Sequence, residues 1–271
     1  MKKPLLYIVL LLLVACEKQS NYPLSTQALD LLVVDGMITS EHKTHAIRLT
    51  RTVGELNAVA PKVSGANIIL SDNVTAFLFH EQVDNPGVYL SPAGFFAKQD
   101  VEYTLLISVE GKTYTAKTFM VANGPLKKPT FIKNSSTNLY QLKWIENPYD
   151  AQHPAMFELL LDWSAVPGYT TLEPQTCKAR IYYYTLPTLD VSEIFAPEIQ
   201  QISFPLGTKV IERRYSLNPG YTEFIRAMIS ETNWKGGLFD SAPANVPTNL
   251  SQGAIGYFAA CGVVSDSLIV Q

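Results

Sequence analysis

Apolar and polar positions alternate over short runs in the first half of the chain, which is the pattern of half-buried β-strands. Strand-like runs occupy residues 31–38, 46–52, 66–70, 75–79, 88–90, 103–109 and 114–119, with turn-forming residues between them. In the last of these turns Gly111 follows Glu110, and a glycine tolerates the positive φ that a tight hairpin needs. About seven such strands within about 95 residues predict an immunoglobulin-like sandwich over residues 28–122.

The sequence Asn-Gly-Pro at residues 123–125 interrupts this pattern and predicts a domain boundary. Strand-like runs resume at residues 139–144, 156–163 and 179–184, so a second β-sandwich-like domain is expected over residues 126–271.

One amphipathic helix is expected in this second domain. Asn218 can cap its first turn, Pro219 suits its first position, and apolar residues at helical spacing follow up to Asn233. A shorter helical turn is expected to begin at Asp190, because Glu193 completes the spacing of a capping box. The predicted fold class is therefore all-β, with two β-rich domains and one amphipathic helix.

The N-terminus has the features of an export signal. Lys2 and Lys3 precede an apolar run at residues 5–14, which is too short to span a bilayer as a helix and predicts a signal peptide over residues 1–15. The sequence Leu-Val-Ala-Cys at residues 13–16 resembles the bacterial lipobox, so we expect cleavage before Cys16 and attachment of lipid to its thiol. The alternative is an ordinary secretory signal that is followed by a cysteine by chance.

Residues 16–27 are polar and aperiodic, and they are expected to form a flexible tether between the membrane and the first domain. An acidic cluster after the lipidated cysteine directs some lipoproteins to the cell surface, but Glu17 is the single acidic residue here. The side of the membrane therefore stays undecided.

Charge and cysteine content narrow the possibilities further. The net charge is −3 and the basic residues are scattered, which argues against nucleic-acid binding because that needs a concentrated basic face. Apart from Cys16, the chain contains Cys177 and Cys261, which in an oxidising compartment could form one disulfide. The alternative is two buried free thiols.

No catalytic or metal-binding residues are predicted. His42 and His45 lie near Glu41, but their spacing of three residues in an expected turn favours a solvated loop over a metal site. Glu158 and Asp162 share a strand face, yet about 13 Å of strand rise separates them, which is too far for paired glycosidic catalysis.

The chain also lacks a Gly-x-Ser-x-Gly nucleophile elbow and a glycine-rich phosphate loop, and no cofactor is expected. Aromatic residues could still bind a sugar or a peptide if they gather on one rim, although most are expected to fill the core. The candidates for such a rim are Phe95, Phe96, Tyr169, Tyr182, Tyr183, Tyr184, Trp234 and Tyr257.

The C-terminal part carries a succession of short motifs behind the expected helix. Gly-Gly-Leu-Phe-Asp at residues 236–240 is followed by Pro-Ala-Asn-Val at residues 243–246 and Gly-Tyr-Phe at residues 256–258. With Val-Asp-Gly at residues 34–36 and Arg-Leu-Thr-Arg-Thr at residues 48–52, these motifs resemble domain-of-unknown-function family 4249. The resemblance implies an envelope lipoprotein of Gram-negative bacteria, whose gene often lies beside that of a TonB-dependent outer-membrane receptor.

The expected function is therefore that of a non-enzymatic outer-membrane lipoprotein. Its expected partners are the membrane, through the lipid on Cys16, and a TonB-dependent transporter; its ligand is unknown. Two alternatives stay open, a surface enzyme acting on glycans or peptides and a structural or adhesive surface protein.

Overall fold

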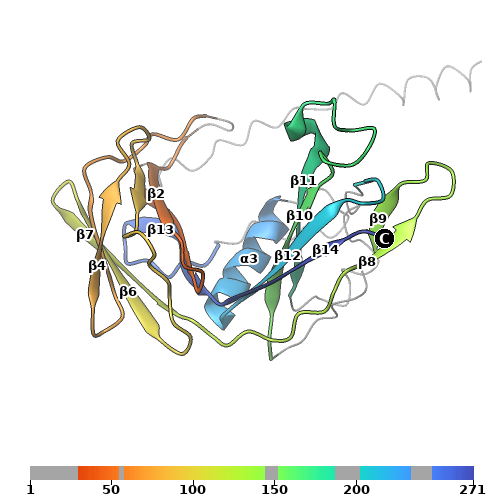
Figure 1. The fold of residues 1–271 in the computed structure, drawn as a ribbon. Coiled ribbons are helices and arrows are strands. Elements are labelled where there is room, and N and C mark those ends of the chain that lie inside the picture. Colours follow the sequence, from red (N-terminus) through yellow and green to blue (C-terminus); the bar gives the residue numbers. More distant parts are fainter. Residues whose placement is uncertain (1–29, 55–57, 144–151, 187–201, 233–245) are drawn as a thin grey trace, which may run out of the picture.

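Two groups of strands, with a helix between them, make up the ribbon in Figure 1. This computed structural model describes residues 30–54, 58–143, 152–186, 202–232 and 246–271. The predicted signal peptide, Cys16 and the helical turn expected at Asp190 lie outside the described residues.

The first group forms one eight-stranded sheet that folds over on itself. In hydrogen-bonded order it runs β13-β1-β2-β5-β4-β3-β6-β7. A bridge between Ala116 and Leu250 brings its two ends together, so the sheet closes into a sandwich. The strands are β1 (Leu32–Thr39), β2 (Ala46–Arg51), β3 (Asn67–Ser71), β4 (Ala76–Glu81), β5 (Val88–Leu90), β6 (Glu102–Val109), β7 (Lys112–Phe119) and β13 (Ala254–Cys261).

Alternating burial along the strands places the core of this sandwich. Every second residue of β6 and of β7 is buried, as a sheet with one face in the core requires. The hairpin between them turns at Glu110 and Gly111, both of which have positive φ, so this part of the prediction is confirmed. The predicted all-β sandwich is confirmed as well. Its largest fully buried side chains are Tyr89, Tyr103, Phe258, Leu32, Ile38, Ile47, Leu49, Ile68, Leu70 and Leu105.

Strand β13 corrects the predicted division of the chain. It comes from the region assigned to the second domain, yet it pairs in parallel with β1 over eight residues, from Leu32 opposite Ala254 to Thr39 opposite Cys261. Residues 126–271 are therefore not a separate domain, because residues 254–261 complete the N-terminal sandwich. Parallel pairing needs a long crossover, and here most of the chain supplies it.

Gly256 is required at its place in β13. Its φ is +93°, which side chains rarely allow, and a Cβ there would overlap the carbonyl oxygen of Val34 on β1. The glycine therefore lets β13 lie close against β1.

The second group is a four-stranded antiparallel sheet in the order β11-β10-β12-β14, with the two-stranded ribbon β8-β9 beside it. Its elements are β8 (Thr130–Lys133), β9 (Tyr140–Lys143), β10 (Ala155–Asp162), the 3₁₀ helix η2 (Pro174–Cys177), β11 (Lys178–Thr185), β12 (Lys209–Ser216) and β14 (Val263–Ile269). Strands β9, β10 and β11 confirm the three predicted runs, whereas β8, β12 and β14 were not predicted. One face of the sheet packs against the ribbon through Leu159, Leu161 and Val210 on the sheet and Leu142 on β9.

Helix α3 (Pro219–Thr232) covers the other face of this sheet and confirms the predicted amphipathic helix. The side chain of Asn218 accepts a hydrogen bond of 2.9 Å from the backbone N–H of Tyr221, which is the predicted N-cap. Ile225 packs with Tyr215 of β12 and with Tyr257 of β13, so the helix contacts both groups of strands.

Candidate functional site

The junction between the two groups of strands lies where β1 and β13 end. Gly262 alone separates β13 from β14, and its carbonyl oxygen accepts a hydrogen bond of 2.9 Å from the N–H of Ser216 on β12. The hydroxyl of Ser40, just after β1, accepts a hydrogen bond of 2.8 Å from the N–H of Val263. The amide of Asn218 also donates to the carbonyl oxygen of Phe119, at 2.9 Å, so several backbone contacts join the two groups.

Glu158 is the centre of a charged cluster at this junction. It lies in the middle of β10, directly opposite Tyr182 on β11 and Arg213 on β12, so all three side chains share the face that α3 partly covers. Its side chain is only 5 % exposed. A carboxylate this deeply buried needs several partners to offset the loss of water.

Four groups satisfy this carboxylate. The hydroxyls of Tyr215 and Tyr182 donate to it at 2.7 and 3.0 Å. Nη1 of Arg213 lies 3.3 Å from Oε2, and Nε of Arg180 lies 3.2 Å from Oε1. Both oxygens are therefore engaged.

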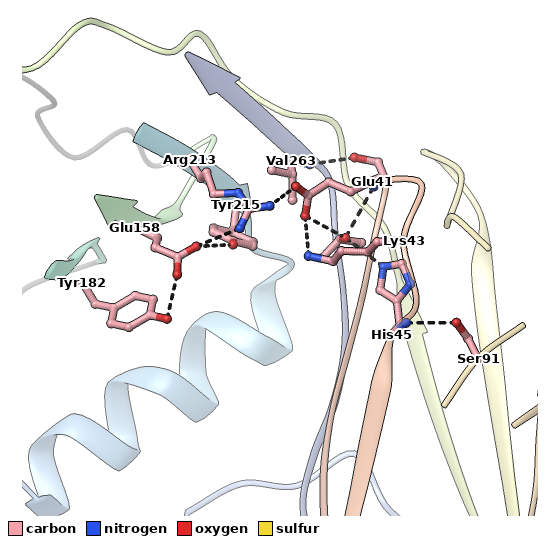
Figure 2. Close-up of polar contacts among 11 residues, drawn as sticks. Glu41, Lys43, His45, Ser91, Glu158, Tyr182, Arg213, Tyr215 and Val263 are labelled. Atoms are coloured by element: carbon pink, nitrogen blue, oxygen red, sulfur yellow. Dashed lines mark hydrogen bonds and ion pairs between the residues drawn. The ribbon is translucent and has the colours of Figure 1, made fainter. Parts of the chain in front are cut away.

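Arg213 links Glu158 to the first group of strands. Its Nη2 donates to Oε1 of Glu41, in the turn after β1, and Nζ of Lys43 lies 2.6 Å from the other oxygen of Glu41. Figure 2 shows the resulting chain of contacts, which runs from Tyr182 on β11 to the turn at the end of β1. Positive and negative groups alternate along it, so each charge has an opposite neighbour.

The pKa directions follow from these contacts. Burial alone would raise the pKa of Glu158, but the hydrogen bonds from Tyr215 and Tyr182 and the charge of Arg213 outweigh it, and the pKa is lowered. At Glu41, burial would likewise raise the pKa, but the hydrogen bonds and charges of Lys43 and Arg213 outweigh it, and the pKa is lowered. Both carboxylates are ionised at neutral pH and bound to cations, an arrangement that holds two surfaces together and leaves neither carboxylate free to accept a proton.

His45 lies beneath the same turn and corrects the prediction of a solvated loop. It is buried, its backbone N–H donates to Oγ of Ser91 at 3.0 Å, and its Nε2 lies 2.9 Å from Oγ1 of Thr39. Burial, with the nearby charge of Lys43, lowers the pKa of His45 to about 4, so the imidazole is neutral at neutral pH. His42, in contrast, is exposed and stacks on Phe96 with 4.0 Å between ring centroids.

A second buried carboxylate lies on the opposite face of the sheet. Glu212, the residue before Arg213 on β12, is 1 % exposed and accepts a hydrogen bond of 2.9 Å from the hydroxyl of Tyr183. Within the described part of the chain its Oε2 has no hydrogen-bond partner. Burial, opposed by Tyr183 and reinforced by the charge of Asp266, raises the pKa of Glu212 to about 7. Sequence reasoning missed this residue, because its strand was not predicted.

The other described residues singled out in the sequence do not form a further charged or metal-binding cluster, and Trp234 lies outside the described residues. Asp162 accepts hydrogen bonds from Ser164 and lies 3.7 Å from Lys178, at the opposite end of β10 from α3. Of the three adjacent tyrosines, Tyr182 and Tyr183 each hydrogen-bond a different buried glutamate, and Tyr184 packs beside α3. Across the described ranges, no three His, Cys, Asp or Glu residues are placed to hold a metal ion.

Cys177 and Cys261 are both buried and free. Cys177 precedes the first residue of β11, whereas Cys261 lies next to the junction, beyond the far end of the same sheet. About 20 Å of strand length separates these two ends, and a disulfide needs Cα atoms within about 7 Å. The structure therefore favours the alternative of two free thiols.

One hollow on the surface of the described residues lies at the other end of the sandwich. It has a volume of about 450 Å³. Its lining residues are Asp30, Leu31, Lys112, Thr113, Tyr114, Gln252 and Gly253. None of the described helices is long and apolar enough to cross a bilayer.

Comparisons with known proteins place the chain in a family. No curated protein matches it. Among solved structures it is similar to the FN1–FN3 domains of chicken CNTN1, with 11 % identity and a TM-score of 0.29 over 70 % of this chain and 63 % of that one. The family profile described as "Domain of unknown function (DUF4249)" matches residues 17–267, so the chain belongs to this family, as its motifs indicated.

Proposed function

We propose that the protein is a non-enzymatic lipoprotein of the outer membrane that serves as an accessory or binding partner of a TonB-dependent transporter. The observation that carries the proposal is the chain of contacts from Glu158 through Arg213 to Glu41. These charged groups bind one another across the junction, and so they fix the angle between two β units. Such an arrangement suits a scaffold that presents loops to a partner.

The sequence around Cys16 supports the membrane part of the proposal. The lipobox-like sequence at residues 13–16 ends on this cysteine, and residues 16–27 would connect the lipid to the sandwich. The proposed partner follows from the family, because the resemblance implies that the gene lies beside that of an outer-membrane receptor. Whether the protein faces the periplasm or the cell surface stays open.

Affinity capture tests the proposal. The full chain with a C-terminal tag would be expressed in its own host, extracted with a mild detergent and captured, and co-purifying proteins would be identified by mass spectrometry. We expect an outer-membrane receptor to co-purify with the natural chain, and we expect a Cys16→Ser variant to leave the membrane fraction and lose most of that receptor.

Repeated recovery of the lipoprotein alone would contradict the transporter role. An unchanged distribution of the Cys16→Ser variant between membrane and soluble fractions would contradict lipid anchoring.

A further inference from the structure

The end of the sandwich that lies away from the junction carries exposed apolar loop tips. We call it the distal end, and define it by residues 52–54, 58–63, 82–87 and 110–111 together with the start of β1. Two contacts place these segments together, since Leu32 lies opposite Arg51 and Arg51 forms an ion pair with Glu110. A hydrogen bond of 2.9 Å from Lys62 to Asn85 joins two of its loops.

Val59 and Val83 are each 92 % exposed on two of these loops, and Val53 is 40 % exposed beside them. Valine side chains this open are unfavourable in water, and several at one end of a domain are typical of a contact surface. Val74 is equally exposed, but it lies in the turn between β3 and β4 at the junction end.

Two acidic residues of the distal end share one arginine. Arg51 binds Glu110, and its Nε lies 3.5 Å from Asp30. With Lys62 and Asp84, these described groups carry two positive and three negative charges, a net charge of −1, so the apolar loop tips and not electrostatic attraction would carry a contact with anionic headgroups.

The polypeptide enters the sandwich at this same end. Asp30 is the first described residue, directly before β1, and it follows Cys16 by 14 residues (30 − 16). A chain of that length spans about 50 Å at most. The eight residues of β1 add about 26 Å to reach the junction end. A lipid on Cys16 would therefore be joined to the sandwich at its distal end.

We infer that the distal end rests on the lipid bilayer, with Val59 and Val83 in the headgroup region and the junction pointing away from the membrane. The inference rests on the proposed lipid anchoring. It would also place the hollow beside Asp30 and Lys112, which lies at the same end of the sandwich, at the membrane surface.

Site-specific fluorescence tests this orientation. Val59→Cys, Val83→Cys and Val74→Cys variants of the lipidated full chain would each be labelled with a polarity-sensitive fluorophore. Labelling is selective, because Cys177 and Cys261 are buried and the lipid blocks Cys16. The proteins would be placed in vesicles of phosphatidylethanolamine and phosphatidylglycerol that carry a headgroup quencher.

Val74→Cys is the matched control, since its side chain is as exposed as the other two but lies at the junction end. We expect quenching at least about twofold stronger, with a blue-shifted emission, for the labels at positions 59 and 83 than for the label at 74.

Flotation of the vesicles distinguishes a failure of lipid anchoring from a failure of the proposed orientation. If the protein does not float with the vesicles, lipid anchoring fails and the orientation fails with it. If it floats but the three labels are quenched equally, or the label at 74 is quenched most, anchoring stands and the orientation is overturned. A blue shift at 59 and 83 that grows with protein density, without quenching by lipid, would assign the distal end to a second copy and would also overturn the inference.

Discussion

Glu212 makes the second sheet sensitive to pH, and replacing it with glutamine tests this. Its pKa is about 7 in the folded protein against an ordinary value of 4.5, because the side chain is buried. The folded state therefore binds this proton more tightly than the unfolded state. The associated stability is fully present below about pH 4.5 and is lost as the pH rises through 7.

The size of the effect follows from the shift. A difference of about 2.5 pKa units corresponds to about 3 kcal/mol of unfolding free energy. Glutamine resembles the protonated acid in shape and can still accept the hydrogen bond from Tyr183, so the Glu212→Gln variant should lose this pH dependence.

Urea denaturation from pH 4.5 to 8, followed by tryptophan fluorescence, measures the effect, since Trp163 packs against the core beside this sheet. We expect the natural protein to lose roughly 3 kcal/mol more than the variant over this range. Parallel curves for the two proteins would refute the reasoning.

Replacing Glu158 with glutamine should change the pH dependence of stability in the opposite direction. The pKa of Glu158 is lowered, so its contribution is present at neutral pH and lost as the pH falls through its lowered pKa. This variant should be less stable than the natural protein at pH 7, and the difference should shrink in acid. A variant as stable as the natural protein at pH 7 would show that the cluster around Glu158 adds no net stability.

Three further predictions concern the junction, β13 and the thiols. An Arg213→Gln variant should lose roughly 2–3 kcal/mol of unfolding free energy, because the carboxylates of Glu158 and Glu41 lose their shared cation. Arg48 is in an exposed ion pair, so Arg48→Gln should change the unfolding free energy by less than about 1 kcal/mol. Equal losses for the two variants in urea denaturation would contradict this. Gly256→Ala should cost at least about 2 kcal/mol by the same assay and more than Gly65→Ala, which has positive φ but open space around it. Burial raises the pKa of Cys261 to about 12, so a thiol reagent should modify it only after unfolding; rapid reaction of the native protein would show that it is accessible.

Local features of the fold were predictable from the sequence. The N-cap at Asn218 and the turn at Glu110 and Gly111 depend on neighbours within four residues, so sequence pattern was enough to locate them. The runs that became β9 and β11 alternate between apolar and polar residues, and the run that became β10 is almost continuously apolar, so each was visible in the local sequence.

The candidate site was not predictable in this way. Glu41 and Arg213 are 172 residues apart, and nothing near Glu41 indicates that a guanidinium will reach its turn. The turn was therefore expected to be solvated, although His45 beneath it is buried. The sequence suggests a pairing of Glu158 only with Asp162 on its own strand, whereas the groups that bind Glu158 come from both neighbouring strands.

The pairing of β13 with β1 also determines the order in which the chain can fold. Leu32 and Ala254 are 222 residues apart (254 − 32), so the sandwich cannot close until nearly the whole polypeptide has been made and, in an exported protein, translocated. Until then one edge of β1 stays unpaired and open to pairing with another chain. A fragment that ends near residue 122 would keep this open edge permanently, and we expect it to aggregate where the full chain folds.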